Sequence, residues 1–105
     1  MDLRVAKVLA AERVVGSEKL VKLSLNAGDK DSAGLPAVRQ ILAGVGKVYV
    51  PEDLIGREIV VVANLEPRMM MGEESNGMLL AASNAEGQPV ILMPEKEVEP
   101  GTKIK

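Results

Sequence analysis

Alternation of apolar and polar residues is the feature that most restricts the fold of this chain. In the segment KLVKLSLNAG, Val21, Leu23 and Leu25 alternate with polar residues, which is the pattern of a strand with one buried face. The same period of two recurs along most of the 105 residues. The sequence therefore predicts an all-β protein, and its length suits a single domain over residues 1–105.

The opening stretch DLRVAKVLAAERVV changes phase, because its apolar residues move from odd positions up to Val5 to even positions from Ala6 onward. A shift of one residue turns the inward face, so we expect a bulge and a bend in a long first strand. Further strands are expected in AVRQILAGV, REIVVVANL, GMLLAAS and PVILM, with a short last strand in VEPGTKIK.

One segment, VPEDLIG, carries helix signals. Pro51 suits a first helical position, Glu52 and Asp53 favour the first turn, and Gly56 is placed to end the helix. A short helix near residues 51–55, between the third and fourth strands, predicts a five-stranded OB-fold barrel with extra C-terminal strands. A small β-sandwich is the alternative, but it explains the bent first strand and the helix position less well.

The sequence offers few residues suited to catalysis. The chain has no His and no Cys, so the usual general base, thiol nucleophile and zinc ligands are absent. The pairs Glu52–Asp53 and Glu73–Glu74 would point to opposite faces of an extended segment. We therefore predict a non-enzymatic protein with no cofactor and no metal. No apolar run approaches the roughly 20 residues of a membrane span, and no signal peptide is visible, so a cytoplasmic location is expected.

The charges are unevenly distributed. Ten basic and nine acidic residues precede position 69, whereas three basic and six acidic residues follow it. Basic side chains on the polar face of the barrel are a candidate nucleic-acid patch despite the net charge of −2. They are Arg4, Lys7, Lys19, Lys22, Arg39 and Arg68. The alternative is that these are scattered solubilising charges.

Tyr49 is the only aromatic residue. OB domains that hold single strands stack bases on aromatic side chains, so this chain is better suited to a folded RNA read by its shape.

The segment NLEPRMMMGEESNGMLLAAS (64–83) places three methionines in an expected loop, where Pro67 ends a strand and Gly72 allows a turn. Methionine is flexible and adapts to a contact surface, so at least one of Met69–Met71 should face outward. One or two of them filling the barrel rim is the alternative.

Several of these segments together resemble the tRNA-binding domain found at the C-terminus of many methionyl-tRNA synthetases. The resemblance rests on DLRVAKV, GSEKLVKLSLNAG, VEPGTKIK and above all RQILAGVGKVYVPEDLIGREIVVVANLEPRMMMGEESNGMLLAAS. The same domain occurs in stand-alone dimeric tRNA-binding proteins and in cytokine-related cofactors of eukaryotic synthetases. The resemblance implies an OB-fold, a homodimer, and non-catalytic binding to the outer corner of the L-shaped tRNA.

The family motif falls on Asn64, Pro67, Arg68, Gly72, Ser75, Gly77 and Met78. The resemblance implies tRNA contacts by Ser75 and Met78, with Asn64, Asn76 and Gly77 beside them and basic support from Lys19, Lys22, Arg39 and Arg68. Many family members have Lys or Arg where Met69–Met71 stand and a hydrophobic residue in place of Glu73, so less positive potential is expected here.

Two rival functions stay open. One branch of the family consists of dimeric peptide-binding export chaperones, although GEESNGMLLAAS looks like the tRNA-binding branch. A pure dimerisation module that pairs synthetase subunits is the other. Because synthetase-borne copies are preceded by further residues, the start at Asp2 suggests a module excised from the C-terminus of a synthetase.

Overall fold

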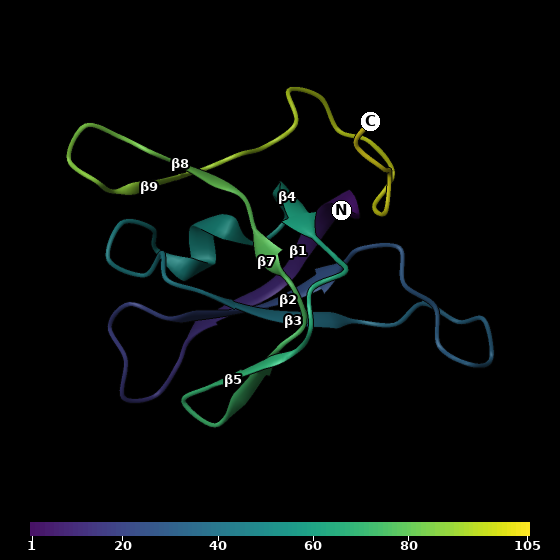
Figure 1. Cartoon of the computed structure of the whole chain (residues 1–105), viewed down its shortest axis with the longest axis horizontal. Coiled ribbons are helices and arrows are strands. Elements are labelled where there is room, and N and C mark those ends of the chain that lie inside the picture. The colour runs from purple at the N-terminus through teal and green to yellow at the C-terminus, as the bar shows by residue number, and fades with distance from the viewer.

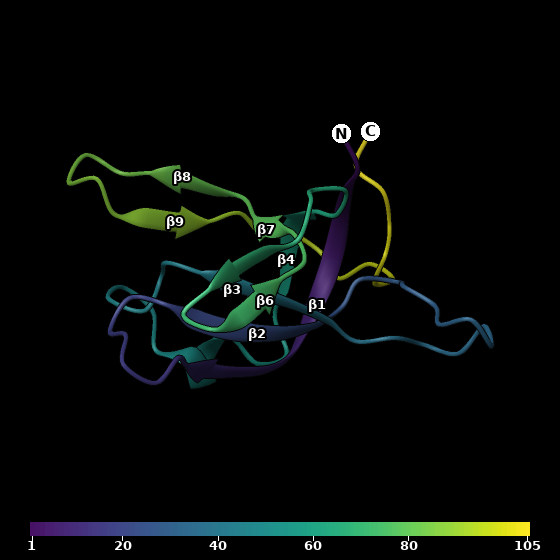
Figure 2. The same cartoon turned by 60° about the horizontal axis from the view of Figure 1, so that its bottom comes forward.

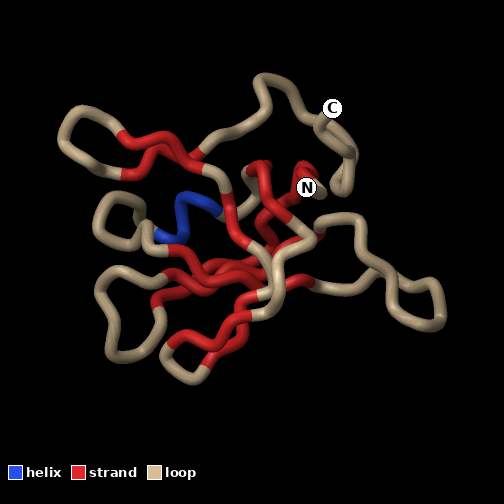
Figure 3. The backbone as a smooth tube through the Cα atoms, viewed as in Figure 1, coloured by secondary structure: helices blue, strands red, loops and turns tan.

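The computed structural model describes residues 1–105, and its backbone consists almost entirely of strands and turns (Figure 3). The single helical element, η1 (Pro51–Leu54), is a 3₁₀ turn. Figure 1 labels most of the strands, which are β1 (Leu3–Arg13), β2 (Val21–Asn26), β3 (Arg39–Ala43), β4 (Glu58–Val62), β5 (Arg68–Met70), β6 (Glu73–Ser75), β7 (Met78–Leu79), β8 (Ala81–Ser83) and β9 (Pro89–Ile91).

Five strands form one antiparallel sheet in the order β3-β2-β1-β4-β7. The sheet curls until β7 approaches β3, which makes a nearly closed barrel. The alternation in β2 decides its inner face, because Val21, Leu23 and Leu25 are completely buried. The prediction of a five-stranded OB-like barrel with its helix between β3 and β4 is confirmed.

The first strand serves two sides of the barrel. Residues Leu3–Lys7 pair with β4 and residues Lys7–Arg13 pair with β2. The register with β2 shifts between Val8 and Ala10, which is the expected bulge. A bulge bends its strand and increases the twist, so β1 can turn the corner from one partner to the other.

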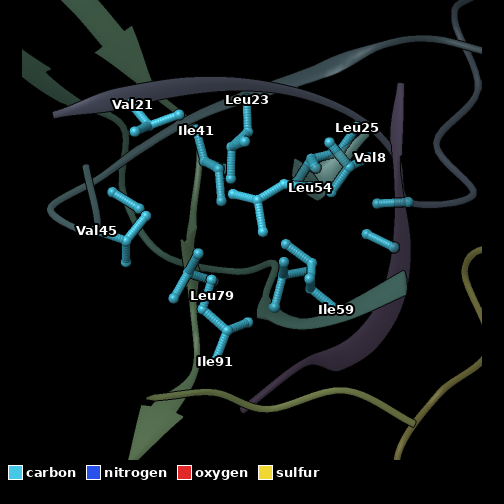
Figure 4. Packing of buried hydrophobic residues seen from close by; sticks show 14 residues of the cluster. Val8, Val21, Leu23, Leu25, Ile41, Val45, Leu54, Ile59, Leu79 and Ile91 are labelled. Atoms are coloured by element: carbon cyan, nitrogen blue, oxygen red, sulfur yellow. The ribbon is translucent and has the colours of Figure 1, made fainter. Parts of the chain in front are cut away.

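The core is aliphatic (Figure 4). Leu54 of η1 joins residues from all five barrel strands and Ile91 of β9 in one buried cluster. The helical turn thus plugs one end of the barrel. Tyr49 packs partly buried against this cluster, and its hydroxyl accepts a hydrogen bond from the Ile91 N–H (3.0 Å).

Three segments differ from expectation. Residues 68–75, predicted as a loop, form the β5–β6 hairpin. The segment GMLLAAS is divided into β7 and β8, and β8 leaves the barrel to pair with β9 in a projecting hairpin (Figure 2). The expected last strand is reduced to a single bridge between Arg4 and Lys103, although the Val5 N–H still donates to Thr102 O (2.8 Å). No helix in the structure is long and apolar enough to cross a membrane.

Candidate functional site

The methionine-rich segment is an ordered hairpin at one rim of the barrel. Arg68 pairs with Ser75, and Met70 pairs with Glu73. Met71 and Gly72 form its turn, with φ of 50° and 79°. Two positive φ values in a two-residue hairpin turn match the twist of the strands, although Met is an unusual residue for this conformation. Met71 is 57% exposed and Met69 is 67% exposed, so both residues lie largely at the surface.

Ser75 fastens the hairpin to the barrel. Its side chain is only 1% exposed, and its hydroxyl accepts a hydrogen bond from the Leu42 N–H (3.0 Å) while donating to Gly77 O (3.0 Å). The next residue continues the attachment, because the Asn76 N–H donates to Gln40 O (2.8 Å). These bonds bridge β3 and the start of β7, where the barrel lacks regular strand pairing. Ser75 is therefore part of the support of this surface, and its hydroxyl is not free to contact a ligand.

Arg39 ties three segments together under the same rim. Its Nη1 donates to Ala63 O and to Asn76 O, each at 2.8 Å. Its Nε and Nη2 form a bidentate ion pair with the Asp29 carboxylate (2.8 and 2.9 Å). This guanidinium lowers the pKa of the Asp29 carboxyl, and Arg4 donates a third hydrogen bond to the same carboxylate. Four of its five N–H groups are bonded within the chain and its side chain is 15% exposed, so Arg39 has little left for a phosphate.

Gly77 permits the closest backbone approach at the site. A Cβ at this position would lie 2.6 Å from Val62 O, and the residue has a φ of 119°. Only glycine fits both constraints without a shift of the backbone. Asn64 lies in the connection that follows β4, where its Oδ1 accepts a hydrogen bond from the Asp2 N–H (2.9 Å).

The basic side chains named from the sequence fall into two groups. Lys22 forms ion pairs with Glu12 (3.1 Å) and Glu73 (3.5 Å), and its hydrogen bond to Glu12 raises the pKa of Lys22. Arg4 and Arg39 are likewise paired with carboxylates, and Lys7 lies 4.0 Å from Glu97. Arg68 and Lys19 are exposed and form no ion pair. The second group therefore supplies the cations at this rim that have no carboxylate partner.

A further basic position was not identified from the sequence. Arg13 at the end of β1 donates through Nη1 to Gly46 O (2.7 Å) and to Glu18 O (3.1 Å). The stem of Lys19 lies across Gly44 on the same turn. The two glycines in AGVGKV could have indicated this position, because a residue without a side chain leaves room for the long side chains of Lys19 and Arg13.

A slot lies between the hairpin and β7. It has a volume of about 150 Å³ and is the most enclosed of the clefts around this rim. Its lining comes from the β4–β5 connection, the hairpin and the start of β7: Leu65, Glu66, Arg68, Met70, Ser75, Gly77 and Met78. Met78 also packs against the core, so one wall is held in place. Leu65, Glu66 and Met70 were not singled out from the sequence as site residues.

The acidic C-terminal segment lies at the other end of the molecule from the hairpin in Figure 1. Glu58 is buried there, and one of its carboxylate oxygens accepts a hydrogen bond from the Val98 N–H (2.8 Å). No three acidic side chains are close enough together to hold a metal ion.

Comparison with protein families gives a match over nearly the whole chain. The model described as "Putative tRNA binding domain" matches residues 3–103. Methionine–tRNA ligase of Caldanaerobacter subterraneus is 50% identical over 99% of this chain, and that of Archaeoglobus fulgidus is 48% identical over 99%. The chain spans only 15% of the length of each of these ligases.

Solved structures give the same picture. A MetRS-related protein from Pyrococcus horikoshii has a TM-score of 0.86 and 30% identity, with 99% of this chain and 89% of that chain covered. The chaperone CsaA from Bacillus anthracis has a TM-score of 0.81 and 34% identity, with 99% and 90% covered. The C-terminal domain of Plasmodium vivax p43 has a TM-score of 0.86 and 29% identity, with 99% and 59% covered.

Proposed function

Because the chain belongs to the tRNA-binding domain family, we propose that it is a non-catalytic tRNA-binding domain serving a methionine–tRNA ligase in the cytoplasm. The matched ligases support the accessory role, since the similarity covers only 15% of their length. The lack of His and Cys agrees with a domain that binds without catalysing.

The binding face in this proposal is the rim that carries the β5–β6 hairpin. The observation that carries it is the exposed, unpaired Arg68 on a hairpin that Ser75 and Arg39 hold against the barrel. Lys19 and Arg13 extend the positive surface towards the turn after β3. A preformed basic rim can contact phosphates without the entropy cost of ordering a loop.

The RNA is recognised by its shape rather than by stacked single-stranded bases. Tyr49 is the only aromatic residue, and it is committed to the core and to the Ile91 N–H. Without an aromatic platform, contacts to the backbone and to exposed edges of a folded RNA supply the affinity. The outer corner of the L-shaped tRNA is the target that the family resemblance implies.

The named site residues take different parts in this proposal. Arg68 and Lys19 contact phosphates, and Met78 contacts the RNA surface. Ser75, Asn76, Gly77 and Arg39 position the hairpin and the start of β7, because their polar groups are bonded within the chain. Asn64 supports the neighbouring turn, and Lys22 is largely neutralised by its two glutamates.

We include a homodimer in the proposal. Val90 and Leu92 on and after β9 are each 43% exposed, which leaves apolar surface on the projecting hairpin. Covering such surface is a common reason for self-association. Light scattering at concentrations from micromolar to millimolar should show twice the monomer mass, and a monomer throughout would remove this part of the proposal.

The central experiment is a filter-binding titration of tRNA against single-stranded RNA of equal length. Folded tRNA should bind more tightly. Arg68→Ala should weaken all tRNAs alike and make the salt dependence shallower by about one phosphate contact. Lys96→Ala is the matched control, because it removes the same charge from the exposed acidic end and should change little.

The chaperone of similar structure provides the second candidate function, peptide binding. The same titration with an unfolded peptide separates the two. Equal binding of single-stranded RNA and tRNA would refute recognition by shape. Peptide binding with no RNA binding would replace the proposed function with that of a chaperone, and binding of neither would leave dimerisation as the role.

A further inference from the structure

We propose that the slot beside the β5–β6 hairpin receives one unstacked nucleobase of the bound RNA, and that its methionines replace the aromatic side chains this chain lacks. The proposal rests on the proposed function and specifies how the RNA is held. The slot is the cleft defined above between Glu66, Met70 and Met78.

The size of the slot suits a six-membered ring. Its volume is about 150 Å³. An engineered protein cavity of roughly 150 Å³ binds benzene, so a ring of this size fits such a space. The slot is open on one side, which lets the sugar and phosphate stay outside. A pyrimidine base fills it, whereas a purine base would project from it.

The walls of the slot offer thioether contacts. Met70 comes from the hairpin and Met78 from the first position of β7, so the two side chains reach the slot from different elements. Sulfur makes favourable contacts with aromatic rings, often at the ring edge. Met78 is anchored by packing against the core, and the hairpin that carries Met70 is fastened through Ser75. The slot is therefore formed before any ligand arrives.

The polar groups around the slot favour a base with an amino group. Glu66 is exposed and makes no ion pair, and its carboxylate can only accept hydrogen bonds. An exocyclic amine such as cytosine N4 donates to a carboxylate of this kind. Ser75 cannot compete for the base, because its hydroxyl is already bonded to Leu42 and Gly77. Among pyrimidines, cytosine is preferred over uracil.

Arg68 completes the site at its mouth. Its guanidinium is exposed and free of carboxylate partners. Such a group can pair with the phosphate that follows an inserted base or lie against the face of the ring. The charge therefore draws the backbone to the rim, while Glu66 and the methionines read the base.

The direct test uses protein labelled with ¹³C at the methionine methyl groups, titrated with millimolar cytidine monophosphate or uridine monophosphate. The two nucleotides carry the same phosphate, so any difference reports the base. The cytidine nucleotide should shift the Met70 and Met78 signals, move them further than the uridine nucleotide does, and leave the distant Met93 unchanged. Glu66→Gln should abolish the difference between the nucleotides. Shifts confined to Met69 and Met71, or no shift at Met70 and Met78, would overturn the proposal.

Variants extend the test to the intact complex. Met70→Ala should weaken tRNA binding by about twofold to tenfold, the loss of one sulfur–aromatic contact. Met69→Ala removes the same side chain from the neighbouring exposed position and should have no effect. Met70→Leu keeps the volume without the sulfur and should give an intermediate loss, while thermal unfolding verifies that all three variants are folded.

The outcomes separate this proposal from the one it rests on. If tRNA binds and the Met69 and Met70 variants behave alike, the base slot is wrong and tRNA binding stands. If the unmodified protein binds no tRNA, the proposed function fails, and the nucleotide titration alone then decides whether the slot accepts a base.

Discussion

Replacing Ser75 with Ala tests whether one buried hydroxyl holds the functional rim to the barrel. The change leaves the Leu42 N–H without its acceptor and Gly77 O without its donor, in surroundings where Ser75 and Leu42 are both buried. A buried group left unsatisfied costs about 1–3 kcal/mol, and the carbonyl costs less because it keeps a second lone pair. We expect the free energy of unfolding to fall by about 2–4 kcal/mol.

This loss is large but tolerable for a domain of this size. Small domains have unfolding free energies of about 5–15 kcal/mol, so the variant should still fold at room temperature. Its melting temperature should fall by roughly 10–25 °C, since each kcal/mol is worth about 4–8 °C in a domain of 60–100 residues. Urea unfolding followed by circular dichroism gives the free energy, and hydrogen exchange of the Leu42 amide reports the broken bond directly.

Ser83→Ala is the matched control. Ser83 lies exposed on β8 and its hydroxyl makes no hydrogen bond within the chain, so this variant should stay within about 0.5 kcal/mol of the parent. The reasoning fails if Ser75→Ala also costs less than about 0.5 kcal/mol, or if the Leu42 amide remains as protected as before.

Two further variants test the neighbouring contacts. The Arg39 hydrogen bond lowers the folded-state pKa of Asp29 below its ordinary value of 3.8, so its stabilisation is present above that pH and disappears as the pH falls through the folded pKa. Asp29→Asn should therefore reduce stability near neutral pH and flatten its decline below about pH 4, measured as urea midpoints across that range. Gly77→Ala should cost more than about 2 kcal/mol, because the new methyl would lie 2.6 Å from a carbonyl oxygen, whereas Gly34→Ala shares a positive φ in open space and should cost only about 1 kcal/mol. Equal losses for the two glycine variants in urea unfolding would show that φ alone, and not the close approach, requires glycine.

The barrel was predictable from local pattern. Alternation buries Val21, Leu23 and Leu25 together, and a change of phase in β1 announced the bulge at Val8–Ala10. Both signals depend only on which face each residue takes. Both predictions therefore hold regardless of how distant parts of the chain are arranged.

The hairpin and the roles of its residues were not predictable in the same way. Met71–Gly72 is not one of the Asn-Gly or Asp-Gly pairs that mark a type I′ turn, so residues 68–75 looked like a loop. Ser75 has Glu and Asn as its neighbours in the sequence, a context that indicates exposure. It is buried because its hydroxyl bonds the Leu42 N–H and Gly77 O between β3 and β7, where regular strand pairing is absent. The pairing of Arg39 with Asp29 joins residues ten positions apart across a loop, and no local sequence pattern indicates it.

Pairing also resolves how an acidic chain can present a surface for RNA. Where Arg4, Lys22 and Arg39 meet carboxylates, the field of each pair falls off quickly and contributes little at the distance of a phosphate. The total charge of −2 therefore says less than the position of the unpaired cations, of which Arg68 stands on the hairpin itself. Because the rim has few free cations, phosphate contacts alone supply only modest affinity for RNA. The binding constant also falls as salt is added, with a slope set by the number of phosphate contacts. A site of this kind needs a second source of binding energy that salt does not screen, and the Met70 thioether, which lines the slot beside the hairpin, is a group able to supply it.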